Sequence, residues 1–138
     1  MDPAWSIARA LAEAEELELV TTGRVSGDPH RVRLHFAYED GVVWLRTGER
    51  ASAPDASGVR RRTESDRTTD WLRNLEQNPA ALIRIADAEI PARYERSVDP
   101  AADLRRVVEL LRRKYGAEWV ADWYLERGRI PVKLRVGA

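Results

Sequence analysis

The sequence contains no cysteine among its 138 residues. This absence excludes disulfide bonds, thiolate catalysis and iron–sulfur clusters held by cysteine. The chain also lacks any apolar run of the roughly 20 residues that a membrane-spanning helix needs, and its N-terminus lacks the apolar segment of a signal peptide. We therefore expect a cytoplasmic protein.

An excess of charge of either sign is absent too, because 23 basic and 23 acidic residues give a net charge of zero. A neutral chain gives no electrostatic reason to expect a nucleic acid or an anionic membrane as partner, so an RNA-binding barrel is disfavoured. Lys114 and Lys133 are the only lysines among the basic residues. The rest are arginines, whose planar guanidinium suits bidentate binding of phosphate. The two histidines, His30 and His35, are five residues apart. Neither a helix nor a strand would place them at one shared metal ion, so no metal is expected.

Alternating apolar and polar residues predict three strands in the first half of the chain, at residues 17–24, 31–36 and 42–47. The second strand places apolar side chains on one face, namely Val32, Leu34 and Phe36. Its other face is basic, with Arg31, Arg33 and His35. Because the turns between these strands are short, with Asp40-Gly41 as the clearest, we expect an antiparallel meander.

The second half of the chain mixes helices with further strands. We expect a polar connection over residues 49–67 and a short helix that starts at Thr68 or Thr69 and stops at Asn78-Pro79. The remaining expected elements are strands at 81–85, 89–96 and 130–136, a turn at Asp87-Ala88, and helices from Asp99-Pro100 to Gly116 and over 118–127. With an N-terminal helix from Asp2-Pro3, six strands and about four helices result. This pattern predicts one α+β domain over residues 1–138, a six-stranded antiparallel barrel with helical decoration.

Three short segments are informative together, at residues 23–27, 71–79 and 91–93. They resemble the deazaflavin-dependent nitroreductase branch of the flavin-binding split β-barrels, a superfamily that includes pyridoxamine-phosphate oxidases. The run Gly-Arg-Val-Ser-Gly at residues 23–27 is similar to the Gly-Arg-Lys-Ser-Gly hairpin of that branch, with Val25 in place of lysine. The pattern Trp-x-x-Asn-Leu-x-x-Asn-Pro is matched at residues 71–79, and Pro-Ala-Arg at 91–93 resembles the strand that follows. The resemblance spans residues 19–94. It implies a split barrel, usually a homodimer, that binds F420, with FMN as the alternative and haem as a third possibility.

The resemblance also implies a reaction, the transfer of a hydride from the reduced cofactor to a small conjugated acceptor such as a quinone, an enone or a nitroaromatic. It implies cofactor contacts from the hairpin, the second and third strands and the short helix, from Arg24, Arg31, Arg33, His35, Thr47, Gly48, Arg50, Trp71 and Asn74. The arginines suit a phosphate, and the helical pair of Trp71 and Asn74 suits the ring and its edge. No side chain is assigned as catalytic acid or base, since the cofactor carries the hydride chemistry.

Other interpretations of the same residues stay open. The basic face of the second strand is also typical of the solvated side of an edge strand. A non-enzymatic barrel that binds a flavin, haem or another tetrapyrrole fits the same motifs, with His30 or His35 as axial ligand of a haem. The arginines at 60–62 are either solvated or bind a phosphate tail. The stretch 49–67 either covers the cofactor as a lid or disrupts its site.

Overall fold

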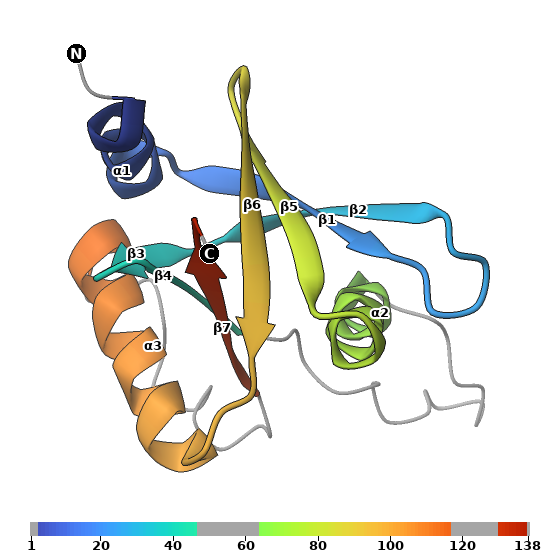
Figure 1. The fold of residues 1–138 in the computed structure, drawn as a ribbon. Coiled ribbons are helices and arrows are strands. Elements are labelled where there is room, and N and C mark those ends of the chain that lie inside the picture. Colours follow the sequence, from blue (N-terminus) through green and yellow to red (C-terminus); the bar gives the residue numbers. More distant parts are fainter. Residues whose placement is uncertain (1–2, 47–63, 117–129, 138) are drawn as a thin grey trace.

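The computed structural model describes residues 3–46, 64–116 and 130–137. Within them, seven strands form one antiparallel sheet in the order β2-β1-β5-β6-β7-β4-β3, and three helices accompany it (Figure 1). The strands are β1 (Glu16–Thr22), β2 (Pro29–His35), β3 (Ala37–Glu39), β4 (Val42–Arg46), β5 (Ala80–Ile85), β6 (Ala88–Glu95) and β7 (Pro131–Val136). The helices are α1 (Pro3–Glu13), α2 (Glu64–Gln77) and α3 (Pro100–Tyr115). The expected α+β class and antiparallel sheet are confirmed. No helix in these ranges is both long and apolar enough to cross a membrane.

The sheet curls because its two outermost strands, β2 and β3, are consecutive in the chain and separated only by Phe36. β2 pairs with β1, whereas β3 pairs with β4. The chain turns a corner at Phe36, whose side chain is fully buried. The expected meander is therefore wrong at this point, and the described residues form seven strands instead of the expected six. The alternation gave no sign of the corner, because Val32, Leu34 and Tyr38 all pack with Phe36 into one core.

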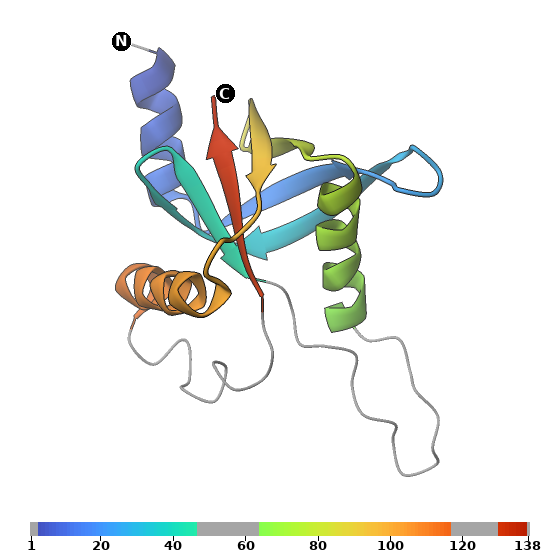
Figure 2. The same ribbon diagram turned by 60° about the horizontal axis from the view of Figure 1, so that its bottom comes forward.

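The inner face of the curled sheet holds the main hydrophobic core. Leu17, Leu19 and Ile83 are among its fully buried strand residues. α1 adds Leu11 to this core, and α2 adds Trp71, Leu72 and Leu75. α3 packs instead on the outer face, in a second cluster of Ala37, Val107, Val108, Leu110 and Leu111 that also contacts Trp44. α2 and α3 consequently lie on different sides of the strands (Figure 2).

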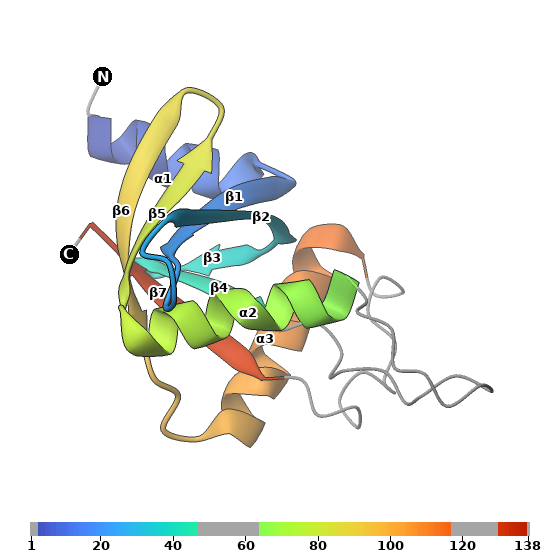
Figure 3. The same ribbon diagram turned by 90° about the vertical axis from the view of Figure 1, so that its right-hand side faces the viewer.

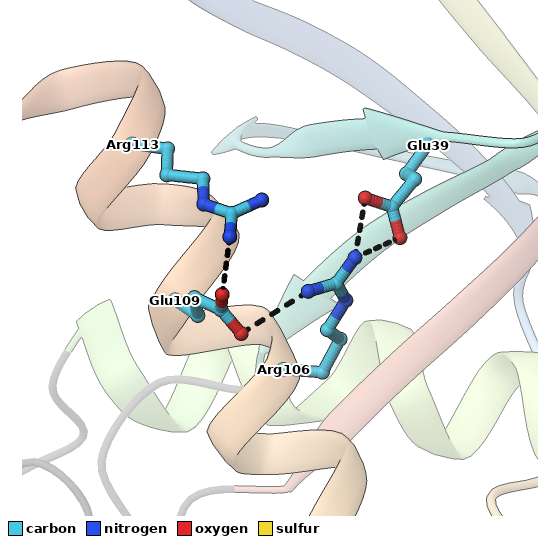
Figure 4. Close-up of polar contacts among 4 residues, drawn as sticks. All are labelled: Glu39, Arg106, Glu109 and Arg113. Carbon is cyan, nitrogen blue, oxygen red and sulfur yellow. Dashed lines mark hydrogen bonds and ion pairs between the residues drawn. The ribbon is translucent and has the colours of Figure 1, made fainter.

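Caps and ion pairs fix α3 against the sheet. The expected N-cap is confirmed, since the Asp99 carboxylate accepts a hydrogen bond from the backbone N–H of Ala102 at 3.2 Å. Midway along the helix, Arg106 bridges Glu39 of β3 at 2.5 Å and Glu109 at 3.1 Å (Figure 4). The helix ends as expected at Gly116, which has a φ of 110°. These contacts determine where the last turn of α3 lies.

Some predicted boundaries differ from the structure. α2 begins at Glu64, earlier than the expected caps at Thr68 and Thr69, because the helix continues into the polar stretch. The expected helix at 118–127 lies outside the described residues, as do residues 47–63 of the polar connection.

In two hairpin turns a residue other than glycine has a positive φ. Asp40 and Gly41 have φ values of 51° and 78°, as the expected two-residue turn requires. The β5–β6 turn consists of Ala86 and Asp87, one residue earlier than expected, because Ile85 pairs with Ala88. Ala86 has a φ of 52°, a left-handed conformation that its Cβ disfavours.

We predict that Ala86→Gly raises the free energy of unfolding by about 0.5–1 kcal/mol, because removal of the Cβ relieves the strain at positive φ. Urea denaturation followed by circular dichroism measures this change. Ala12→Gly, in the exposed face of α1, is the matched control and is expected to lower the stability by a similar amount. A loss of stability in both variants would contradict the prediction.

Candidate functional site

The turn between β1 and β2 is fixed to α2 by one buried amide. Asn74 is fully buried, and its Oδ1 accepts hydrogen bonds from the backbone N–H of Arg24 at 3.2 Å and from Arg24 Nη1 at 2.9 Å. Its Nδ2 donates to Thr21 Oγ1 at 3.1 Å. The turn thereby comes down onto the helix (Figure 3). The structure thus brings together two residues of the predicted site, Arg24 and Asn74, through an internal contact.

The same turn explains the spacing of the hairpin motif at residues 23–27. The N–H of Gly23 donates to the carbonyl of Asp28 at 2.8 Å, and the N–H of Gly27 donates to the carbonyl of Gly23 at 2.8 Å. A Cβ on Gly23 would lie 2.8 Å from Ser26 Oγ, which itself accepts from the N–H of Asp28 at 3.1 Å. Close packing inside the turn accounts for glycine and serine at these positions without reference to a ligand.

The basic face of β2 points outward, and a charged row crosses the sheet beside it. Arg33 lies opposite Glu18 in the register, and Glu18 lies opposite Arg84 of β5. Arg84 binds Glu18 at 3.3 Å and Glu89 of β6 at 3.6 Å. The charges therefore alternate in sign from β2 to β6. Arg33, Glu18 and Arg84 line an open groove of about 410 Å³. Alternating charges in neighbouring strands stabilise the sheet and partly neutralise the arginines.

Glu16 completes this arrangement at the end of β2 that leads to the corner. It lies opposite His35, with His35 Nε2 at 3.5 Å and Arg33 Nη1 at 3.9 Å from its carboxylate oxygens. Glu16 and Glu18 were not among the residues expected beside the basic face. Both residues alternate with leucines in the run Glu16-Leu17-Glu18-Leu19. Only the register of the hairpin shows that this alternation places them beside the basic face.

Arg31 differs from Arg33 in its surroundings. Its side chain is exposed, and it makes no hydrogen bond or ion pair with the described part of the chain. In the register, Arg31 pairs with Val20 of β1. Val20 pairs in turn with Leu82 of β5, and Leu82 pairs with Pro91 of β6. An apolar row across β1, β5 and β6 (Val20, Leu82 and Pro91) thus starts beside the guanidinium of Arg31, which has no carboxylate partner among the described residues.

The other predicted site residues are buried or outside the description. Trp71 is only 2% exposed and belongs to the main core, and its indole Nε1 has no hydrogen-bond partner among the described residues. Contact of Trp71 or Asn74 with a bound ring stays a prediction. Thr47, Gly48 and Arg50 follow Arg46, where the described residues end, so their roles also stay predictions.

Several solved structures have a fold similar to that of this chain. No family model and no curated protein matches the chain. Similar solved structures include a protein assigned to 5-nitroimidazole antibiotic resistance from Bacteroides thetaiotaomicron (TM-score 0.66, 16% identity, 100% of this chain and 82% of that chain). They also include an F420 reductase (0.62, 18%, 94% and 92%) and the heme storage protein of Vibrio cholerae (0.59, 14%, 100% and 92%). The chain therefore has the split-barrel fold, as the sequence resemblance implied.

We predict that Asn74→Ala lowers the free energy of unfolding by about 2–3 kcal/mol, because Thr21 and the Arg24 N–H lose their partners in a buried place. Chemical denaturation measures the loss. Asn78→Ala is the matched control, since in the described structure the exposed Asn78 side chain accepts one hydrogen bond, from the N–H of Ala80 at 3.2 Å, and it is expected to cost less than about 1 kcal/mol. Equal losses in the two variants would contradict a special role of the buried amide.

Proposed function

We propose that the protein binds a phosphate-bearing, flavin-type cofactor on the outer face of β2 and uses it for hydride transfer. F420 is the cofactor we favour, and FMN is the alternative. The observation that carries the proposal is Arg31, an exposed guanidinium without a partner in the described part of the chain, at the start of the apolar row of Val20, Leu82 and Pro91. The split-barrel fold, which an F420 reductase and a FAD-binding protein also have, supports the proposal.

The residues present fit such a cofactor in their chemistry. A guanidinium binds phosphate through charge-assisted, bidentate hydrogen bonds, and no carboxylate of the described residues lies within ion-pair distance of Arg31 to compete with the phosphate. The half-buried side chains of Val20 and Leu82 offer an apolar surface to a planar ring. Arg33 contributes less, because Glu16 already faces it.

When bound, the cofactor supplies the hydride chemistry. The side chains of this protein then hold the phosphate, orient the ring and exclude water from one of its faces. The acceptor would be a small conjugated molecule such as a quinone, an enone or a nitroaromatic. A homodimer in the cytoplasm is part of the same proposal.

The proposal predicts that Arg31→Ala weakens cofactor binding about tenfold or more, since a hydrogen bond to a charged group contributes roughly 1.5–3 kcal/mol. Arg33→Ala is expected to have a smaller effect because of Glu16. Arg105→Ala, which removes an exposed arginine from α3, is the matched control and should leave binding unchanged. Dissociation constants come from titration of the purified chain with oxidised F420 and with FMN, followed by fluorescence quenching. An unchanged affinity in Arg31→Ala would overturn the site.

Haem belongs in the same titration, followed by absorbance, because the heme storage protein of Vibrio cholerae has a similar fold. Tight binding of F420 or FMN together with turnover of a quinone or nitroaromatic supports the reductase. Tight binding of haem alone, or of any of the three without turnover, would instead support a non-enzymatic carrier.

A further inference from the structure

The last turn of α3 closes over the corner at Phe36. The Tyr115 hydroxyl accepts a hydrogen bond from the N–H of Phe36 at 3.3 Å. The same hydroxyl lies within donating distance of the carbonyl oxygens of Phe36, at 3.1 Å, and Glu15, at 2.5 Å. Beside it, Lys114 Nζ donates to the carbonyl of Phe36 at 3.1 Å and lies 3.6 Å from the centroid of the Phe36 ring. Two side chains of one helix thus hold both backbone polar groups of the corner residue.

The corner needs these partners because the sheet cannot provide them. The pairs of β2 with β1 end at His35, and the pairs of β3 with β4 begin at Ala37. Phe36 lies between the two ladders, and a backbone N–H or C=O that is removed from water without a partner is costly. Tyr115 and Lys114 satisfy these groups and so stabilise the change of direction.

Tyr115 also touches the basic face of β2. Its ring and the ring of His35 meet edge to face, with centroids 5.3 Å apart and planes at 86°. His35 shares that face with Arg31 and Arg33, which precede it at two-residue steps along the strand. The last turn of α3 therefore contacts both the backbone at the end of β2 and the last side chain of its outer face.

The charge of Lys114 changes near neutral pH. Burial lowers the pKa of Lys114 to about 8, against the opposing effect of Glu15. The other titratable groups at this place in the described structure are Glu16, His35 and Tyr115, and burial raises the pKa of Tyr115 above its usual value, so its hydroxyl keeps its proton. Between about pH 7 and pH 9 the amine loses its proton, and with it the attraction of a cation to the Phe36 ring.

We propose that Lys114 and Tyr115 are positioning residues for the basic face of β2, where the proposed cofactor binds. They hold the backbone at Phe36, and in this way they set the direction in which Arg31 and Arg33 project. The inference rests on the proposed function for its consequence, but the hold on β2 is measurable without any cofactor.

The first measurement is amide hydrogen exchange along β2 and the corner in the full chain. Tyr115→Phe keeps the ring against His35 and removes the hydroxyl, and Lys114→Met keeps the aliphatic stem and removes the charge. We expect each variant to speed exchange at residues 33–37 about tenfold, because each removes a hydrogen bond that holds the strand closed. Arg105→Ala, on the same helix, should leave exchange there unchanged. Equal rates in wild type and both variants would overturn the inference.

The second measurement is the dissociation constant of F420 and of FMN at about pH 7 and about pH 9. We expect both variants to weaken binding about fivefold at the lower pH. The wild type should weaken toward the Lys114→Met value at the higher pH, whereas Lys114→Arg, which stays charged, should keep its affinity. A wild type and a Lys114→Arg variant with the same pH profile would contradict the part assigned to the lysine charge.

The two measurements separate this inference from the proposed function. If the wild type binds neither F420 nor FMN, the proposed function fails, and exchange in β2 alone decides whether α3 holds the strand. If the wild type binds and Arg31→Ala does not, unchanged affinity in Tyr115→Phe and Lys114→Met overturns the inference and leaves the proposed function standing. Circular dichroism checks folding, and Lys114→Met carries the test if Tyr115→Phe fails to fold.

Discussion

The closure of the sheet depends on the buried backbone of Phe36, which pairs neither with β1, the partner of β2, nor with β4, the partner of β3. Phe36 is fully buried and lies between the two ladders, so a corner of this kind needs side chains that satisfy its N–H and C=O. Several features of α3 serve this requirement. The Asp99 cap sets where the helix begins, the bridge from Arg106 to Glu39 fixes it against β3, and Lys114 and Tyr115 then reach the corner.

A second buried contact acts at the opposite end of β2. Asn74 of α2 holds the turn that precedes the strand, as Tyr115 of α3 holds the corner that follows it. β2 pairs with only one neighbour, β1, so half of its backbone groups lack a partner strand in the described sheet. Helices on two sides of the sheet thus fix both ends of an edge strand. This gives the outward face of that strand a defined direction that a single ladder would leave weakly determined.

The sequence predicted the features that depend on local chemistry and the short hairpins, and it missed the change of partner strand after Phe36. Asp40-Gly41 and the Asp99 cap are local signals, and both are confirmed. The corner at Phe36 left no trace in the sequence. The partner strand changes there from β1 to β4, but the alternation of apolar side chains toward the main core continues through it. Likewise, Asn74 was identified by its motif, yet a motif does not distinguish a residue that contacts a ligand from one that holds a turn.

A motif likewise does not distinguish an arginine that is free to bind a ligand from one that pairs with a carboxylate. For Arg31 and Arg33, the register of β2 with β1 makes this distinction. A chain of zero net charge still has locally uncompensated cations if pairing places carboxylates beside some arginines and apolar residues beside others. Arg33 faces Glu18 and lies near Glu16, whereas Arg31 faces Val20. Because a split barrel serves unrelated functions in different proteins, the fold itself does not select a ligand. In the described structure, the register gives one of two neighbouring arginines an opposite charge and leaves the other beside an apolar row.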